Sequence, residues 1–249
     1  MGIETAAPTP LTSGEMHPGP GFRVRTDVDR SAASLAPRFL QFPTPDISDR
    51  MNRLFTMHQA IHSLTGDRLR LSGVAVTARV FPGDNLMVHK AMDVARPGDV
   101  IVVDTSSSLL TAVLGDMICT KAHHRGIAGF VVDGLIRDLD GIMELGTMPV
   151  FARGTTPIGP LHRGPGEVNH PVACGGVVVH PGDLVVGDAD GVVVVPRDVA
   201  PTVLADLEDG AERATRYAAA VRRGDFSNDW VDRVLVDGGL DATDLAPDG

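Results

Sequence analysis

The spacing of hydrophobic positions changes along the chain, and these changes indicate where helices and strands lie. Short runs rich in Val, Ile and Leu alternate with segments in which apolar residues recur every three or four positions. The first pattern is typical of buried strands and the second of helices with one buried face. This alternation favours an α/β fold with a partly parallel sheet and helices packed against it. We predict strands over 71–80, 100–103, 127–132 and 149–152, and helices over about 45–57, 86–95, 116–124 and 137–145.

The pattern changes in the second half of the chain. Between residues 153 and 198, short Val-rich segments are separated by Gly and Pro, which predicts an all-β region. The tripeptide Pro-Gly-Asp precedes Val-rich segments at 97–99 and 181–183, and we interpret both as turns with glycine at positive φ. A last clear helix is predicted over 199–223. The expected strands of the all-β region lie over 177–179, 184–186 and 192–195.

The two ends of the chain lack the regular pattern of its middle. Residues 1–38 contain several prolines and little periodicity, which predicts a flexible N-terminal arm. Residues 39–224 are expected to form the core together with the last helix, and residues 225–249 to form a C-terminal extension. The 28 Gly and 18 Pro residues fit this division, because both residue types end regular elements and make sharp turns.

Composition narrows the classes of function. The chain of 249 residues has a formal net charge of −10 and only 4% aromatic residues. A phosphate-backbone binder needs a basic surface and a base-stacking platform needs aromatic rings, so we predict no nucleic-acid partner. Two cysteines do not make a disulfide framework. The sequence has neither a signal-like start nor a long apolar run, and we therefore expect a cytoplasmic protein with no membrane partner.

Candidate chemistry is concentrated between residues 114 and 140. Gly115-Asp116 opens a predicted helix directly after a loop. The backbone N–H groups of Met117 and Ile118 then belong to the first helical turn, where they lack intrahelical partners. Such a helix start makes a small anion site suited to a carboxylate.

A second candidate feature follows the strand predicted over 127–132. Arg137-Asp138 comes after it across a short Asp133-Gly134 turn, and ligands commonly bind past the carboxyl ends of strands in α/β sheets. Arginine offers a fork for a carboxylate, and aspartate is a hard metal ligand. The same two residues would also suit an exposed ion pair at a helix start, so their spacing alone leaves both interpretations open.

Together these residues resemble a family signature. Asp116, twenty intervening residues and then Arg137-Asp138 resemble the motif of the class II pyruvate aldolases, which cleave 4-hydroxy-4-methyl-2-oxoglutarate and 4-carboxy-4-hydroxy-2-oxoadipate. The regulator of ribonuclease activity A belongs to the same superfamily. The resemblance covers roughly residues 40–220. Further matching blocks are Asn85-Leu86 with His89, Gly126–Gly129, Pro149–Gly154, Val168-Asn169, Gly175-Gly176 and Asp188–Val192.

The resemblance implies a fold and a set of roles. The fold is a β/β/α swivelling domain with a central mixed sheet flanked by helices and a C-terminal helix, assembled as a homotrimer or homohexamer. Asp138 would hold a divalent ion, Mg²⁺ or Mn²⁺, and Arg137 would face the substrate's carbonyl oxygen. Asp116 would order the water around the metal. The substrate would meet the backbone at Gly115 and the amides of Met117 and Ile118.

A glutamate from an adjacent subunit completes the site in that family. Glu212 on the last predicted helix is the nearest match, although Glu208 competes for the role and either residue could instead be a solvated carboxylate. Where the family often has Gly-Gly, this chain has Thr105 to Ser108, which would either alter the pocket or form a hydroxyl-rich turn. We interpret His89 and Cys119 as structural residues.

The resemblance also implies an activity. It predicts a metal-dependent lyase that cleaves a 4-hydroxy-2-oxo acid, releases pyruvate through an enolate, and decarboxylates oxaloacetate as a side reaction. Its partner would be a small 2-oxo acid. The alternative is a non-catalytic interaction protein like the ribonuclease regulator. The intact set of Asp116, Arg137 and Asp138 favours the enzyme, because a protein that only binds a partner has no need of a metal ligand beside an arginine.

Overall fold

The computed structural model describes residues 21–241. The ends of the expected arm and of the expected extension, residues 1–20 and 242–249, lie outside the described residues. The chain divides into two compact units, the first ending at Leu204 and the second beginning at Ala205. The sequence placed the end of the core at residue 224, some way into the second unit. Each unit is described by itself.

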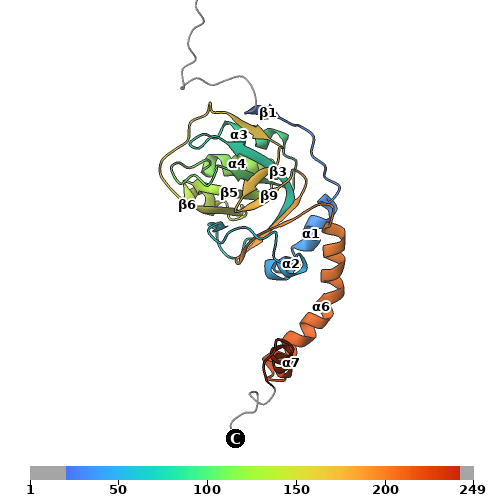
Figure 1. The fold of residues 1–249 in the computed structure, drawn as a ribbon. Coiled ribbons are helices and arrows are strands. Elements are labelled where there is room, and N and C mark those ends of the chain that lie inside the picture. The colour runs from blue at the N-terminus through green and yellow to red at the C-terminus, as the bar shows by residue number, and fades with distance from the viewer. Residues whose placement is uncertain (1–20, 242–249) are drawn as a thin grey trace, which may run out of the picture. The chain divides into compact units, whose positions relative to one another are not determined.

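A mixed sheet organises the first unit (Figure 1). Its strands lie in the order β1-β7-β3-β4-β5-β6-β2, and β10 pairs with both β3 and β11. The four strands β3 to β6 run parallel to one another, which confirms the sheet predicted from the alternating pattern. The strands are β1 (Phe22–Val24), β2 (His62–Ser63), β3 (Leu71–Val80), β4 (Asp99–Asp104), β5 (Gly129–Ile136), β6 (Val150–Thr155), β7 (Gly166–Val168), β10 (Leu184–Asp188) and β11 (Gly191–Val195), with β8 (Val172–Cys174) and β9 (Val177–Val179) paired separately.

The helices follow the predicted order. α3 and α4 connect the parallel strands of the first unit, α6 begins in the first unit and continues into the second, and α7 follows it there. The short helix η1 and α1 are adjacent in the chain. The bounds are η1 (Ala33–Leu35), α1 (Ala36–Phe39), α2 (Thr44–Arg50), α3 (Leu86–Val94), α4 (Asp116–His124), α5 (Leu139–Glu144), α6 (Ala200–Arg222) and α7 (Asp229–Asp237).

Both faces of the sheet are covered, and β4 shows why its sequence is continuously apolar. Ile101 and Val103 belong to a core cluster that also contains residues of α3 and α4. Val100 and Val102 belong to a second cluster, shared with residues of β8 to β11. Because successive side chains of a strand point to opposite faces, a strand buried on both sides needs apolar residues at every position.

The chain between residues 132 and 137 differs from the prediction. Asp133-Gly134 is not a turn, since β5 continues to Ile136 with a register shift between Val132 and Leu135. The Asp133 carboxylate accepts hydrogen bonds from the Arg153 guanidinium and from the backbone N–H of Gly175, the latter at 2.8 Å. A buried carboxylate that is paired in this way can remain inside a strand.

The helix predicted over 45–57 is also shorter than expected. α2 ends at Arg50, and Asn52 and Arg53 take positive φ values of 54° and 65°. L-residues in that conformation cannot continue a right-handed helix. Met51 and Met57 are nevertheless buried, so the apolar residues that suggested a helical stripe pack into the core from irregular backbone.

Part of the expected flexible arm is built into the sheet. β1 pairs parallel with β7, in register from Phe22 with Gly166. Farther along, the Arg30 guanidinium lies 2.7 Å from the Asp99 carboxylate, and both side chains are largely buried. Two contacts with distant residues order this segment: β7 accepts it as a neighbouring strand, and the buried Asp99 carboxylate pairs with Arg30. Neither contact can be predicted from the local sequence of the segment.

The two Pro-Gly-Asp turns are confirmed. Gly98 and Gly182 take φ values of 86° and 99°, which glycine adopts at little cost. The aspartate after each glycine is buried and closes its turn. Asp99 accepts a hydrogen bond from the N–H of Arg96, and Asp183 from the N–H of His180.

The segment from Thr105 to Ser108 is a hydroxyl-rich turn. Ser106 and Ser107 take φ values of 57° and 56°, which is left-handed backbone that glycine adopts at less cost. The Thr105 hydroxyl donates to the Asp133 carbonyl and accepts from the N–H of Ser108. The turn is therefore held by its own hydrogen bonds, at the cost of two residues in left-handed backbone.

Replacing Ser106 with glycine is expected to stabilise the protein. We expect Ser106→Gly to raise the free energy of unfolding by about 0.5–1 kcal/mol, because relief of the left-handed strain exceeds the extra chain entropy of glycine. Urea denaturation followed by circular dichroism measures the change. Ser106→Ala is the matched control, since it removes the hydroxyl but keeps the strained backbone. Equal stability of the two variants would contradict this explanation.

Among the helices of residues 21–241, none is both long enough and apolar enough to cross a membrane.

Candidate active site

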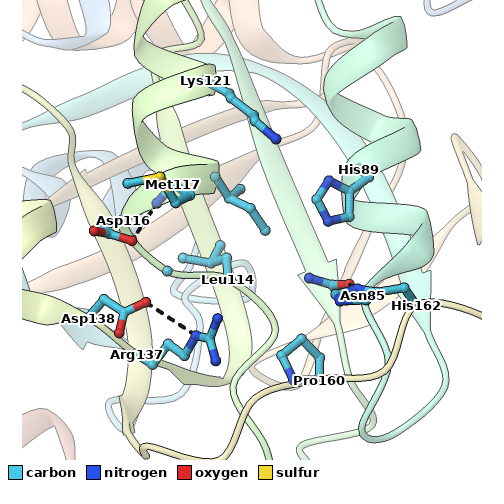
Figure 2. Close-up of a pocket in the computed structure, with 12 residues that line it drawn as sticks. Asn85, His89, Leu114, Asp116, Met117, Lys121, Arg137, Asp138, Pro160 and His162 are labelled. Carbon is cyan, nitrogen blue, oxygen red and sulfur yellow. Dashed lines mark hydrogen bonds and ion pairs between the residues drawn. The ribbon is translucent and has the colours of Figure 1, made fainter.

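A cavity of about 270 Å³ lies where the start of α4 meets the end of β5 (Figure 2). It brings together all the site residues that the sequence predicted within the first unit. The residues after β5 lie close to the start of α4 because the chain leaves β5 beside the segment that leads into α4. The lining residues are Asn85, His89, Leu114, Gly115, Asp116, Met117, Ile118, Lys121, Arg137, Asp138, Pro160 and His162.

The start of α4 has the geometry expected of a helix that faces a ligand. Gly115 is its N-cap residue, with extended backbone at φ −151° and ψ −165°. Asp116 is the first helical residue, and its Oδ1 accepts a hydrogen bond of 2.6 Å from the N–H of Met117. The amide of Met117 is therefore already paired in this structure. Ile118 follows in the same first turn, where an N–H has no partner within the helix.

Arg137 and Asp138 stand at the junction of β5 and α5. The N–H of Arg137 donates to the Leu114 carbonyl at 3.0 Å, which fixes the end of the strand against the segment before α4. Asp138 is the N-cap of α5 and takes left-handed backbone, with φ 57° and ψ 41°. Arg137 Nε lies 3.2 Å from Asp138 Oδ2, and the two side chains are 44% and 43% exposed. Strained backbone of this kind concentrates at functional sites.

Glycines make room for the three charged side chains. A methyl group on Gly115 would overlap Asp138 Oδ2, and one on Gly159 would lie 2.5 Å from Arg137 Nη1. A methyl group on Gly141 would lie 2.9 Å from Cβ of Asp116. Each charged residue is thus packed against backbone that carries no side chain. The glycine of the predicted turn, Gly134, instead faces Thr105 and is not part of the pocket.

The opposite end of the pocket contains residues that sequence analysis did not place there. Asn85 donates through Nδ2 to the Val113 carbonyl at 2.9 Å, and its Oδ1 lies 2.6 Å from Nδ1 of His162. The His162 ring meets that of His89 edge-on, with 5.8 Å between centroids. No spacing in the sequence connects residue 162 with residues 85 and 89. The contact depends on the path of the loop between β6 and β7.

His89 is a lining residue of the pocket, although its position inside a helix suggested a structural role. Burial lowers the pKa of its imidazole, and the positive charges of His162 and Lys121 lower it further. His89 is therefore neutral at neutral pH. In that form it supplies one hydrogen-bond donor and one acceptor to the cavity.

The carboxylates of the pocket suit a metal ion that keeps most of its water. Among residues 21–241 no group of three or more His, Cys, Asp and Glu side chains could enclose a metal ion. Asp138 and Asp116 nevertheless both line one end of an open cavity, and the missing side chain at Gly115 leaves space beside Asp138. Mg²⁺ is typically held by one or two carboxylates together with water and substrate oxygens, so this donor set fits Mg²⁺ or Mn²⁺.

The remaining predicted residue, Glu212, belongs to the second unit. It lies on α6 and accepts a hydrogen bond of 2.9 Å from Arg216, one helical turn later, with 80% of its side chain exposed. Its contribution to the site of an adjacent subunit stays a prediction.

Both cysteines are buried, and Cys119 has the structural role expected of it. Cys119 is buried on α4, and burial, followed by the negative charge of Asp116, raises the pKa of its thiol to about 12. Burial also raises the pKa of Cys174 well above its ordinary value. A thiol that stays protonated at neutral pH is neither a nucleophile nor a metal ligand.

Comparison with known proteins identifies the family. The Aldolase/RraA model of RraA-like proteins matches residues 44–194. A Halalkalibacterium halodurans protein named "Putative 4-hydroxy-4-methyl-2-oxoglutarate aldolase" is 45% identical over 67% of this chain and 79% of its own.

Two solved structures are also similar. RraAS2 of Streptomyces coelicolor, described as an unusual member of the RNase ES inhibitor RraA family, is 31% identical, with a TM-score of 0.69 over 77% of this chain and 98% of its own. The RNA-processing inhibitor RraA of Thermus thermophilus is 35% identical, with a TM-score of 0.57 over 62% of this chain and 93% of its own. The family match and the fold agree with the predicted resemblance, and the chain belongs to the RraA-like Aldolase/RraA family.

Proposed function

We propose that this chain is a divalent-metal-dependent aldolase that cleaves a 4-hydroxy-2-oxo acid and releases pyruvate. One observation carries the proposal: Asp116, Arg137 and Asp138, from the start of α4 and the end of β5, line one end of a single open pocket. The aldolase name of the Halalkalibacterium relative supports the same reaction class.

The reaction needs stabilisation of negative charge on one oxygen. Loss of the proton from the 4-hydroxyl group turns C4 into a carbonyl carbon and breaks the C3–C4 bond. The electron pair of that bond moves to C3 and the 2-oxo group, which becomes an enolate, and protonation at C3 completes pyruvate. Groups that bind the enolate oxygen more strongly than the ketone oxygen lower the barrier.

The residues of the pocket divide this work. The Arg137 guanidinium binds the 2-oxo oxygen, where charge develops. Asp138 would hold Mg²⁺ or Mn²⁺, which supplies Lewis-acid stabilisation of the same oxygen. Asp116 would orient the water that takes the hydroxyl proton, and the Ile118 amide in the first turn of α4 would receive the carboxylate of the pyruvyl group. Stabilising the same enolate also permits decarboxylation of oxaloacetate.

We further infer that the protein acts as a homotrimer or homohexamer, in which Glu212 of an adjacent subunit would complete the site. Three exposed leucines of the first unit, Leu109, Leu110 and Leu161, support an assembly, since clustered apolar side chains mark contact surfaces. Leu110 and Leu161 line a mostly apolar hollow. We propose a cytoplasmic enzyme whose partners are small 2-oxo acids.

Pyruvate release is the direct test of this function. We expect the protein to release pyruvate from 4-hydroxy-4-methyl-2-oxoglutarate, and more slowly from oxaloacetate, in a lactate dehydrogenase-coupled assay. Mg²⁺ or Mn²⁺ should stimulate both reactions at least about 100-fold over protein treated with a chelator, because the ion neutralises the developing charge. Failure to release pyruvate from either compound in the presence of metal would refute the aldolase.

The alternative function is a protein-binding regulator, which the similarity to the RNA-processing inhibitor RraA and to a member of the RNase ES inhibitor RraA family favours. The net charge of −10 would suit a partner with a basic face. A protein that inhibits a ribonuclease and releases no pyruvate would support this alternative, whereas metal-stimulated pyruvate release supports the enzyme.

A further inference from the structure

The far end of the pocket carries a cation that the proposed reaction does not use. Lys121 lies on α4 and lines the cavity. Figure 2 shows the Lys121 side chain extending toward His89. His89 lies on the opposite side of the pocket from Asp138. Within the described part of the chain, no carboxylate lies within ion-pair distance of Lys121, whereas Arg137, the other strong cation of the pocket, is paired with Asp138. The Lys121 ammonium group is therefore available to an anionic ligand.

The neighbours of Lys121 offer further hydrogen-bonding groups. Because Nδ2 of Asn85 donates to a carbonyl, its Oδ1 must accept from Nδ1 of His162. The hydrogen bond fixes which His162 nitrogen carries the proton and holds the ring in place. Nε2 of His162 is then left for a ligand, as an acceptor or, when protonated, as a donor. His89 is neutral, and Lys121 is the group at this end whose positive charge does not depend on the protonation of an imidazole.

The overall charge of the protein makes this local cation significant. A net charge of −10 disfavours the approach of any anion, and a ligand with two carboxylates is disfavoured more than a ligand with one. Local cations must overcome that repulsion. Arg137 and a divalent ion would bind the carboxylate at one end of such a ligand, and Lys121 is able to bind the carboxylate at the other end.

We propose that Lys121 forms a second anion subsite, through which the protein selects 2-oxo acids that carry a second carboxylate at the far end of the molecule. The inference rests on the proposed function, which places the 2-oxo acid group at Arg137 and Asp138. It identifies a specificity-determining residue outside the reacting centre. Asn85 acts in the subsite as a positioning residue, through His162.

A matched pair of ligands tests the subsite by binding alone. 2-Oxoglutarate and 2-oxopentanoate share a five-carbon skeleton and differ only in a terminal carboxylate in place of a methyl group. Neither has a 4-hydroxyl group or a carboxylate on C3, so neither can be cleaved. In calorimetric titrations with Mg²⁺ present, we expect the full-length protein to bind 2-oxoglutarate at least about tenfold more tightly, as a charge-assisted hydrogen bond allows.

The two lysines of the chain supply the test variant and its control. Lys121→Met keeps most of the side chain's length and removes its charge, and it should reduce the ratio of the two affinities to near one. Lys90→Met removes the same charge from α3, where Lys90 lies 4.0 Å from Asp93 and does not line the pocket. It should keep the wild-type ratio, which separates a contact with the ligand from a change in net charge. Thermal unfolding should show that both variants remain folded.

The outcomes separate this inference from the proposed function. Three results would each overturn the subsite. The wild-type protein would bind neither compound, it would bind both equally, or Lys121→Met would keep the wild-type preference for 2-oxoglutarate. The titrations involve no turnover, so they stand even if the pyruvate assay fails. Metal-stimulated pyruvate release with an unchanged ratio in Lys121→Met would retain the aldolase and reject the role of Lys121.

Discussion

Replacing Arg137 with alanine is expected to lower kcat for pyruvate release by a factor of about 10²–10³. Loss of one donor to a developing oxyanion costs this much in other enzymes, because the donor contributes mainly in the transition state. The Arg137 side chain is 44% exposed and lies at the end of a strand, so the fold should tolerate its removal. We expect the free energy of unfolding to change by less than about 0.5 kcal/mol. Steady-state kinetics with saturating Mg²⁺, together with urea denaturation, measure both effects.

A conservative variant separates charge from geometry at the same position. Arg137→Lys keeps a positive charge but loses the planar fork that matches a carboxylate or an enolate. It should recover part of the lost kcat and remain well below the wild type. Arg153→Lys is a useful control because Arg153 pairs with the buried Asp133 away from the pocket lining. Wild-type kcat in Arg137→Ala would remove this residue from the mechanism.

The helices and strands that were predictable are those specified by the hydrophobic pattern of their own residues. β3 and α4 have the predicted bounds, because a long apolar run and a segment with one apolar face each specify one structure. The resemblance also implied that Arg137 and Asp116 belong to one site, and both residues line the same pocket. The sheet explains why they approach: β4 and β5 are parallel neighbours, so the segment that leads from β4 to α4 and the segment that follows β5 lie at the same edge.

The errors arise where distant contacts decide a local structure. Asp133 suggested a turn, but Arg153 and the backbone of Gly175 pair with its carboxylate and keep it in a strand. Residues 22–24 of the expected flexible arm form β1, because β7 accepts them as a neighbouring strand. The subsite around Lys121 needs His162, some forty residues farther along the chain, and no periodicity records that approach. Sequence patterns report local preference and burial, whereas these features depend on pairings between remote segments.

The packing of Gly115 against Asp138 leads to the second large expected effect. The backbone of Gly115 is extended, a conformation that any residue adopts, so alanine there causes no backbone strain. Its methyl group would instead overlap Asp138 Oδ2, and the carboxylate, being the end of an exposed side chain, would have to move. Gly115→Ala should therefore displace the metal ligand and leave the fold in place. We expect the free energy of unfolding to fall by no more than about 1 kcal/mol.

The kinetic signature of Gly115→Ala is a change in metal dependence. We expect the Mg²⁺ concentration that gives half-maximal pyruvate release to rise by a factor of about 10–100, the range by which mutating residues that support a metal ligand weakens metal binding in other sites. Gly159→Ala is the matched comparison, because its methyl group would press on Arg137 Nη1 instead. It should lower kcat and leave the half-saturating Mg²⁺ concentration near the wild-type value. If both variants changed the metal dependence equally, the assignment of the ion to Asp138 and of the enolate oxygen to Arg137 would be wrong, because the tightest contact of the added methyl group is with Asp138 at Gly115 and with Arg137 at Gly159.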